Sequence, residues 1–214
     1  MPRCKIFVAA FFSLRLQNQQ QFWALGYPDG EQVGLRELLE ACARICRAVT
    51  APVSVDIERG YGKTPEEVAA TVRSLLEMGI VGINIEDGFA PGKKELASPG
   101  ILAEKISAIR AVAEEAGVRL FINARIDTYF APAADPHARF EETVRRAQKY
   151  IAAGADGIFV PGLESLEEMA RLARLLMRPL NIYAGYAGLP PVSELRRAGI
   201  KRVSLGCGPL QAAL

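Results

Sequence analysis

The sequence contains a single histidine, His137, among its 214 residues. It lies in the segment Ala-Pro-Ala-Ala-Asp-Pro-His-Ala-Arg, which is typical of a surface loop. One histidine in such a loop argues against a serine–histidine–aspartate triad and against a zinc site built from several histidines. The chemistry must then be carried by carboxylates, arginine, lysine, tyrosine, hydroxyls, thiols or a metal held by oxygen.

Cysteine pairs and long apolar runs are also missing. The four cysteines form no Cys-x-x-Cys motif, and they are Cys4, Cys42, Cys46 and Cys207. Their apolar surroundings favour buried thiols in a reducing compartment. No apolar run approaches the ~20 residues of a transmembrane helix. Basic residues precede a short apolar run at the start, but no small-residue cleavage site follows, so we expect a cytoplasmic protein.

Charge of one sign is not in excess either. The chain has 26 Lys and Arg against 24 Asp and Glu, and no basic block stands out. We therefore expect neither a nucleic-acid partner nor a membrane surface. Hydrophobic residues make up 50% of the chain and charged residues 23%, which is ordinary globular usage. We expect one domain over residues 1–214.

From Val53 onward, short β-branched runs alternate with longer stretches of helical apolar spacing. The expected strands are Val53–Ile57, Gly82–Glu86, Leu120–Arg125, Gly157–Val160, Leu180–Tyr183 and Arg202–Leu205. The expected helices are Leu35–Val49, Pro65–Met78, Leu102–Ala116, Phe140–Ala153, Ser165–Leu176 and Val192–Ala198. Serial βα units predict a parallel sheet with right-handed crossovers.

Both a (β/α)8 barrel and a doubly wound sheet fit this order. No Gly-x-Gly-x-x-Gly follows a strand, and acids and arginines recur at strand ends, which would converge on one rim in a barrel. We predict an α/β fold of the (β/α)8 TIM-barrel type. Because six of the eight strands are visible, we expect the barrel to be incomplete at both termini, with an atypical segment at 1–22. Another chain or subunit could complete it, and its open edges predict a homo-oligomer.

Acidic side chains gather at the ends of the first expected strands and at an early turn: Asp29, Asp56, Glu58 and Glu86. Asp56 and Glu58 alternate along a strand and therefore point to the same side. Carboxylates that meet at one rim repel each other unless a cation lies between them. Oxygen ligands without His or Cys suit Mg²⁺. The alternative is a set of salt bridges to Arg59 and Arg125.

At this point the sequence resembles a known family. Val-Asp-Ile-Glu-Arg-Gly-Tyr-Gly at 55–62, Asn-Ile-Glu-Asp-Gly at 84–88 and Asn-Ala-Arg-Ile-Asp at 123–127 are similar to the isocitrate lyase and phosphoenolpyruvate phosphonomutase superfamily. The resemblance is greatest to its small phosphonomutase and 2-methylisocitrate lyase-like members. Leu-Gly-Tyr-Pro-Asp-Gly-Glu at 25–31 and Pro-Gly-Leu at 161–163 also fit, so the resemblance runs from about residue 22 to the end.

The resemblance implies a role for each residue. Asp56 would approach Mg²⁺, or Mn²⁺ in its place, most directly, and Glu58, Glu86 and Asp29 would hold its waters. Arg125 would grip the substrate carboxylate or phosphonate. The catalytic set implied is Arg125, Asp56 and Glu86, and the substrate-binding set is Arg125, Asn123, Trp23 and Gly185. The implied substrate is a small α-keto acid or its phosphonate analogue, cleaved through a metal-stabilised enolate.

Two stretches depart from the family pattern. The lyases carry a Lys-Lys-Cys-Gly-His-type loop where this chain has Phe89-Ala-Pro-Gly-Lys-Lys-Glu-Leu-Ala-Ser, without Cys or His. The region at 19–23 also replaces the family's Ser-Gly stretch with Gln-Gln-Gln-Phe-Trp. The missing Cys and His argue against true isocitrate or 2-methylisocitrate cleavage. The same loop contains no Asn to accept a phosphoryl group, so we expect cleavage of a C–C bond in preference to a P–C bond. The alternative is a catalytically impaired remnant or binding protein that retains the acidic cluster.

Overall fold

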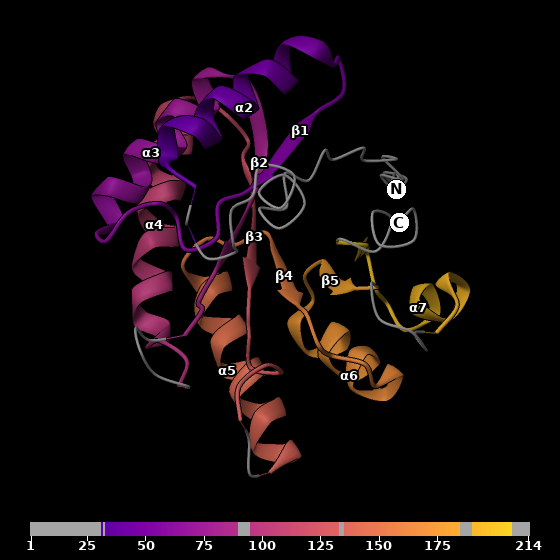
Figure 1. Cartoon of the computed structure of the whole chain (residues 1–214). Helices are drawn as coiled ribbons and strands as arrows, with labels where there is room; N and C mark the ends of the chain where they lie inside the picture. The colour runs from indigo at the N-terminus through magenta and orange to yellow at the C-terminus, as the bar shows by residue number, and fades with distance from the viewer. Residues whose placement is uncertain (1–30, 32, 90–94, 133–134, 185–189, 207–214) are drawn as a thin grey trace.

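The computed structural model describes residues 31, 33–89, 95–132, 135–184 and 190–206. They form six parallel strands with helices along one side of the sheet (Figure 1). The strands are β1 Val53–Asp56, β2 Ile80–Glu86, β3 Phe121–Arg125, β4 Gly157–Val160, β5 Leu180–Tyr183 and β6 Arg202–Ser204. The helices are α2 Leu35–Ala48, α3 Pro65–Glu77, α4 Pro99–Glu115, α5 Pro136–Ala152, α6 Leu166–Leu176 and α7 Val192–Arg197.

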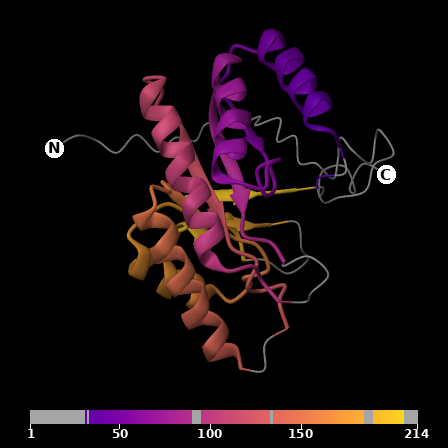
Figure 2. The same ribbon diagram turned by 90° about the vertical axis from the view of Figure 1, so that its left-hand side faces the viewer.

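The strands follow one another in sequence order across the sheet, from β1 to β6, and every pairing is parallel. The sheet curls, and Figures 1 and 2 show its helices standing side by side on the convex face. Within the described residues β1 and β6 do not pair with each other, so the sheet forms a partial TIM-type barrel. The predicted fold class is confirmed. None of the helices in the described ranges is both long and apolar enough to cross a membrane.

Two helices begin earlier than the apolar pattern indicates. Helix α4 begins at Pro99, after Ser98 accepts a hydrogen bond from the Gly100 amide, and α5 begins at Pro136. The Asp135 side chain accepts hydrogen bonds from the amides of His137 and Ala138. The expectation of a loop around His137 is therefore wrong, because proline is well tolerated in the first turn of a helix. His137 is nevertheless exposed.

Alternation along the strands separates two faces of the sheet. The residues that face the helices are apolar and buried: Val53, Val55, Ile83, Ile85, Ile122, Ala124, Ile158, Val160, Leu180 and Ile182. The residues of the opposite, inner face are mostly polar: Ser54, Asp56, Asn84, Glu86, Asn123, Arg125, Asn181, Arg202 and Ser204. Because the helices cover the convex face, most of the apolar core lies between the sheet and the helix layer.

The packing of the helices on the sheet can be tested by substitutions in α4. Ile106 of α4 is fully buried in the core, whereas Ile101 of the same helix is 50% exposed. We expect Ile106→Ala to lower the free energy of unfolding by about 2–5 kcal/mol, through lost burial and the cavity left behind. The matched change Ile101→Ala should alter it by less than about 0.5 kcal/mol. Urea unfolding followed by circular dichroism measures both, and equal losses would contradict the described packing of α4.

Candidate functional site

The turn after β1 holds two non-glycine residues in an unusual backbone conformation. Glu58 has φ +47° and Tyr61 has φ +55°, with Gly60 at φ +107° between them. A Cβ atom on Gly60 would lie 2.7 Å from Cγ1 of Val68 in α3, so only glycine fits at this position. Positive φ values at larger residues cost free energy, about 1–3 kcal/mol each. The rest of the fold must therefore hold this turn in place.

A buried lysine of α4 supplies part of that restraint. The Nζ atom of Lys105 donates hydrogen bonds to the carbonyl oxygens of Arg59, at 2.7 Å, and Gly62, at 3.0 Å. Burial of its ammonium group lowers the pKa of Lys105, while Glu31 acts in the opposite direction. The side chain joins the two ends of the turn to the helix layer. It thereby fixes the backbone that carries Glu58.

A chain of buried hydrogen bonds orients the Asp56 carboxylate. Its Oδ1 accepts from the Glu58 amide at 3.0 Å, and its Oδ2 accepts from Nδ2 of Asn84 at 3.1 Å. The Oδ1 of Asn84 in turn accepts from Nδ2 of Asn123 at 2.8 Å. These side chains are register partners on three neighbouring strands. Each Asp56 oxygen keeps a lone pair that no described hydrogen bond uses, so the carboxylate can still accept a ligand.

The same row ends at Gly157 on β4, which pairs with Asn123. A Cβ atom at Gly157 would lie 2.9 Å from Cζ of Phe121 and 3.0 Å from Oδ1 of Asn123. The absence of a side chain at Gly157 therefore leaves room for the side chains of Phe121 and Asn123.

Arg125 lies at the end of β3, between two carboxylates. Its Nε and Nη2 contact the Asp127 carboxylate at 2.7 and 3.2 Å, and its Nη1 contacts Glu86 at 2.8 Å. Burial alone would lower the pKa of Arg125, but Glu86 and Asp127 raise it overall, so the guanidinium stays charged. Three of its nitrogens are engaged, which leaves N–H groups for a ligand.

Glu86 lies close to Arg125 and to three other carboxylates. Burial raises its pKa, and although Arg125 lowers it, the carboxylates of Asp127, Asp56 and Glu58 raise it further. Three other acids are thus within electrostatic range of Glu86 on this rim. Their mutual repulsion is the physical condition that a bound cation would relieve.

Asp87 connects the carboxyl ends of β2 and β3 to helix α5. Its Oδ2 accepts from Nη1 of Arg146 at 2.8 Å and from the hydroxyl of Tyr150 at 2.9 Å, both on α5. Its Oδ1 accepts from the amide of Asp127 at 3.1 Å. Burial raises the pKa of Asp87, and Arg146 opposes that shift. One buried carboxylate therefore joins the end of β2, the end of β3 and α5, and fixes the residue that holds Arg125.

The donor set fits Mg²⁺ in its chemistry. All the candidate ligands are carboxylate oxygens, and Asp56 is buried with lone pairs to spare. Among the residues that the structure describes, no three His, Cys, Asp or Glu side chains lie close enough to hold an ion directly. Mg²⁺ commonly takes only one or two protein carboxylates and keeps several waters. Asp56 is thus suited to direct contact, and Glu58 and Glu86 to contact through water.

The structure brings most of the predicted site residues together. Asp56, Glu58 and Glu86 lie on neighbouring strands or directly after them, beside Asn123 and Arg125. Glu86 pairs with Arg125, as the salt-bridge alternative expects, whereas Asp56 contacts an amide and a backbone N–H. The predicted residues Asp29, Trp23 and Gly185 lie outside the described residues, and so does the segment 90–94 with its two lysines.

Sequence reasoning assigned no supporting role to five residues of the site, which are Asn84, Asp87, Lys105, Asp127 and Arg146. The strand-end pattern already includes Asp87 and Asp127, beside Glu86 and Arg125, but it does not indicate their partners. Asp127 follows Arg125 by two positions, so their spacing already placed both on one side of an extended chain. No comparable signal pointed to Lys105, whose partners are carbonyl oxygens more than 40 positions away in sequence.

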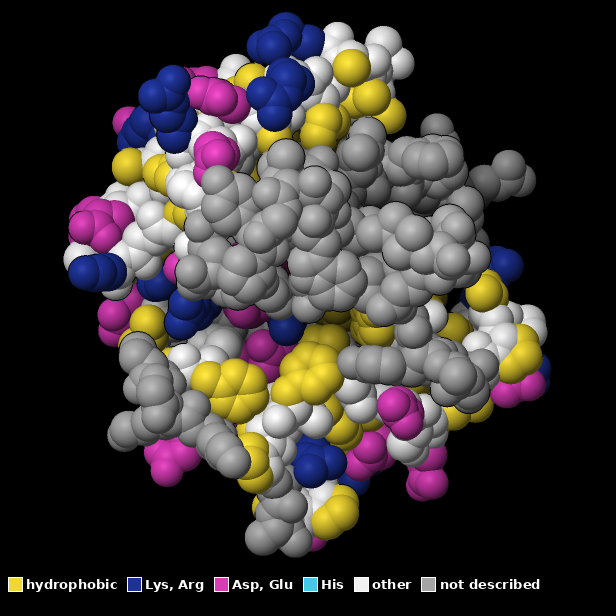
Figure 3. Space-filling view, in the orientation of Figure 1, with side chains coloured by type: hydrophobic (Ala, Val, Ile, Leu, Met, Phe, Trp, Pro, Cys, Tyr) yellow, Lys and Arg dark blue, Asp and Glu magenta, His cyan; other side chains and the backbone are white. Residues whose placement is uncertain are grey.

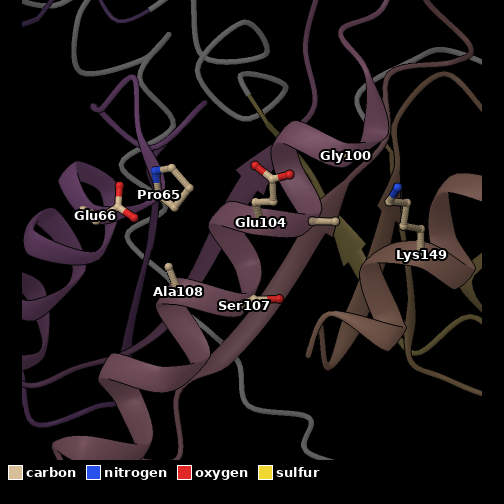
Figure 4. A pocket seen from close by; sticks show the side chains of 8 residues that line it. Pro65, Glu66, Gly100, Glu104, Ser107, Ala108 and Lys149 are labelled. Atoms are coloured by element: carbon tan, nitrogen blue, oxygen red, sulfur yellow. The ribbon is translucent and has the colours of Figure 1, made fainter.

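In the space-filling view, acidic and basic side chains lie next to each other near the middle of the face shown (Figure 3). A different hollow, of about 440 Å³, lies on the outer helix layer between α3, α4 and α5. Figure 4 shows Glu66, Glu104 and Lys149 along this outer groove. The groove lies on the outside of the helix layer, on the other side of the helices from the inner face that carries Asp56, Glu86 and Arg125, so we do not place the chemistry there.

Comparison with known proteins gives consistent matches. The sequence model of the family described as phosphoenolpyruvate phosphomutase matches residues 19–214. A 2-methylisocitrate lyase from Aeropyrum pernix is 35% identical over 95% of this chain and 66% of its own length. Oxaloacetate decarboxylase 1 from Pseudomonas fluorescens is 30% identical over 89% of this chain and 64% of its own. The chain thus spans slightly less than two thirds of these two relatives.

A solved structure agrees with these sequence matches. A Burkholderia cenocepacia J2315 protein, provisionally named a phosphonomutase, is 39% identical and superposes with a TM-score of 0.83. The match covers 89% of this chain and 76% of that one. Sequence and structure therefore agree over most of the chain.

The buried ion pair between Asp87 and Arg146 can be used to test whether Asp87 stabilises the part of the fold that carries the site. We expect Asp87→Ala to lower the free energy of unfolding by about 3–5 kcal/mol, because it leaves the Arg146 guanidinium buried with one partner fewer. The matched control is Glu141→Ala, which breaks the exposed pair with Arg171 and should cost less than about 1 kcal/mol. Urea denaturation measures both. Similar values for the two variants would show that Asp87 does not anchor the rim.

Proposed function

Because the chain belongs to the phosphoenolpyruvate phosphomutase family, we propose that it is a Mg²⁺-dependent carbon–carbon lyase acting on a small α-keto acid. The observation that carries the proposal is the convergence of Asp56, Glu86 and Arg125 on one rim of the sheet. Acids there suit a cation, and the arginine suits an anionic substrate group. Mn²⁺ is the proposed substitute for Mg²⁺.

Each residue has a defined task in this proposal. Asp56 holds the ion, and its carboxylate is kept in orientation by Asn84 and by the Glu58 amide. Arg125 donates its remaining N–H groups to the substrate carboxylate, while Asp127 fixes the plane of the guanidinium. When bound, Mg²⁺ supplies positive charge that stabilises the oxyanion developing as the C–C bond breaks. Asn123 lies beside this position and is proposed to contact the substrate.

Trp23 and Gly185 complete the proposed substrate-binding set, and Asp29 completes the proposed acids. Glu58 and Glu86 orient waters of the ion in this scheme. The chain is further proposed to work as a homo-oligomer, since within the described residues both edges of its sheet are open.

The preference for C–C over P–C cleavage has two supports. The sequence from Phe89 to Ser98 contains no asparagine to receive a phosphoryl group. Relatives with at least 30% identity are named 2-methylisocitrate lyase and oxaloacetate decarboxylase. Both names denote reactions in which a C–C bond is broken.

A binding protein without turnover is the second candidate. It is favoured by one observation, that the sequence from Phe89 to Ser98 contains no Cys or His to serve as an acid or base, where the lyases of the family carry both. Such a protein would bind Mg²⁺ with a small oxo acid and release it unchanged. The two candidates share their binding residues, so turnover separates them.

Removal of Asp56 tests the metal position. We expect Asp56→Ala to abolish the binding of Mg²⁺ with oxalate, an enolate mimic. A neutral water molecule cannot supply the negative charge of the carboxylate that contacts the ion. Glu58→Ala should weaken binding less, by about tenfold, since an acid that acts through water only orients it. Glu104→Ala, in the outer groove, is the control and should bind as the parent does.

Isothermal titration calorimetry gives the affinities, and circular dichroism checks that each variant is folded. If folded Asp56→Ala bound as tightly as the parent, the metal position proposed here would be wrong.

A turnover screen tests the reaction class. We expect the parent protein with Mg²⁺ to consume oxaloacetate and leave phosphonopyruvate unchanged, as followed by pyruvate release and by phosphorus NMR. Conversion of phosphonopyruvate alone would reverse the preferred bond. Binding of oxalate without conversion of either compound would favour the second candidate.

A further inference from the structure

A second arginine faces the interior of the partial barrel. Arg202 on β6 pairs in register with Asn181 on β5, which pairs with Phe159 on β4, and Phe159 pairs with Arg125 on β3. Register partners on neighbouring strands point to the same face of a sheet. Arg202 therefore shares the inner face with Arg125 and lies in the same register row, three strands away across the curled sheet.

The two arginines differ in how their charge is balanced. Arg125 contacts two carboxylates, those of Glu86 and Asp127. In contrast, no hydrogen bond or ion pair within the described ranges engages the Arg202 guanidinium, although the residue is partly buried. Burial lowers the pKa of Arg202, and the electrostatic effect of Asp56 opposes this, which agrees with a position facing β1 across the interior. A guanidinium that stays charged in such surroundings favours an anion.

The neighbouring side chain presents a donor to the same space. Asn181 is 1% exposed, and its Oδ1 accepts a hydrogen bond from the Ser204 hydroxyl at 2.9 Å. Its Nδ2 is buried and has no hydrogen-bond partner. Buried donors are nearly always satisfied in folded proteins, so an unused one on an inner face indicates a ligand group. Arg202 and Asn181 together offer one cation and one neutral donor, the combination that binds an oxyanion.

We infer that Arg202, with Asn181, is a substrate-binding residue that recognises a second anionic group of the substrate, separate from the group held by Arg125. The inference rests on the proposed function and extends it. The substrate must then carry two anionic ends, an oxo-acid end at Asp56 and Arg125 and a distal carboxylate or phosphonate at Arg202. Selectivity for the distal group comes from β6, on the far side of the sheet from the acids.

The test compares ligands that differ in the distal group. Calorimetry in the presence of Mg²⁺ measures the affinity of oxalate and pyruvate, which lack a distal anion. It also measures 3,3-difluorooxaloacetate, with a distal carboxylate, and phosphonopyruvate, with a distal phosphonate. We expect Arg202→Met to weaken the last two at least about tenfold and oxalate less than about threefold.

Two further variants sharpen the result. Arg202→Lys should retain part of the distal affinity, because lysine keeps the charge without the planar fork. Arg197→Met, on an exposed arginine of α7, is the matched control and should bind all four ligands as the parent does. The larger of the two losses, for the carboxylate or for the phosphonate, identifies the distal group.

Several outcomes would overturn the inference. An equal loss of affinity for oxalate and for the difluorinated ligand would show that Arg202 acts on the metal site. No loss of affinity for any ligand would show that Arg202 does not contact the substrate. If Arg202→Met does not fold, the affinities of the parent protein test the inference instead. If the parent binds difluorooxaloacetate no more tightly than pyruvate, the inference is contradicted. Failure of the parent to bind oxalate with Mg²⁺ overturns the proposed function as well, whereas the other outcomes leave it standing.

Discussion

The register of the parallel strands is the constraint on which the site depends. Asp56, Asn84 and Asn123 form one row across β1, β2 and β3, and Glu86 pairs with Arg125 one step further along. Because side chains alternate between faces, a slip of one residue would turn the whole row toward the helices. The buried isoleucines and valines of the other face prevent such a slip, since they would have to face the polar interior instead. Packing on one face thereby fixes chemistry on the other.

The sequence was sufficient for the fold because its periodicities are strong. Six strands and their helices were expected within a few residues of where they lie, and the largest misplacement, at His137, came from taking a helix-starting proline for a loop. Strand ends likewise indicated Asp56, Glu86 and Arg125 as neighbours. The contacts that support the site could not be predicted from the sequence. Asp87, for example, contacts Arg146, which lies 59 positions away in the chain, and no local pattern encodes such a contact.

Charge is distributed unevenly around the inner face. The acids stand at the ends of β1, β2 and β3, where Arg125 is shared between Glu86 and Asp127. The last strand contributes Arg202, which is free of such partners among the described residues. A ligand in this interior would meet an acidic side suited to a metal and a basic side suited to an anion. The curl of the sheet, more than any single loop, creates that polarity.

The lysine beneath the first turn has a consequence for folding order. The backbone at Glu58 and Tyr61 is unfavourable in isolation, and Lys105 reaches it from a helix that is separated by two further elements of the chain. The turn therefore gains its shape only after α4 has docked on the sheet. A nascent or partly unfolded chain would lack the acid-bearing turn while keeping most of its helices. The site can therefore bind a ligand only late in folding, after the helices have packed on the sheet. It should lose that ability early in unfolding, when the helices begin to separate from the sheet.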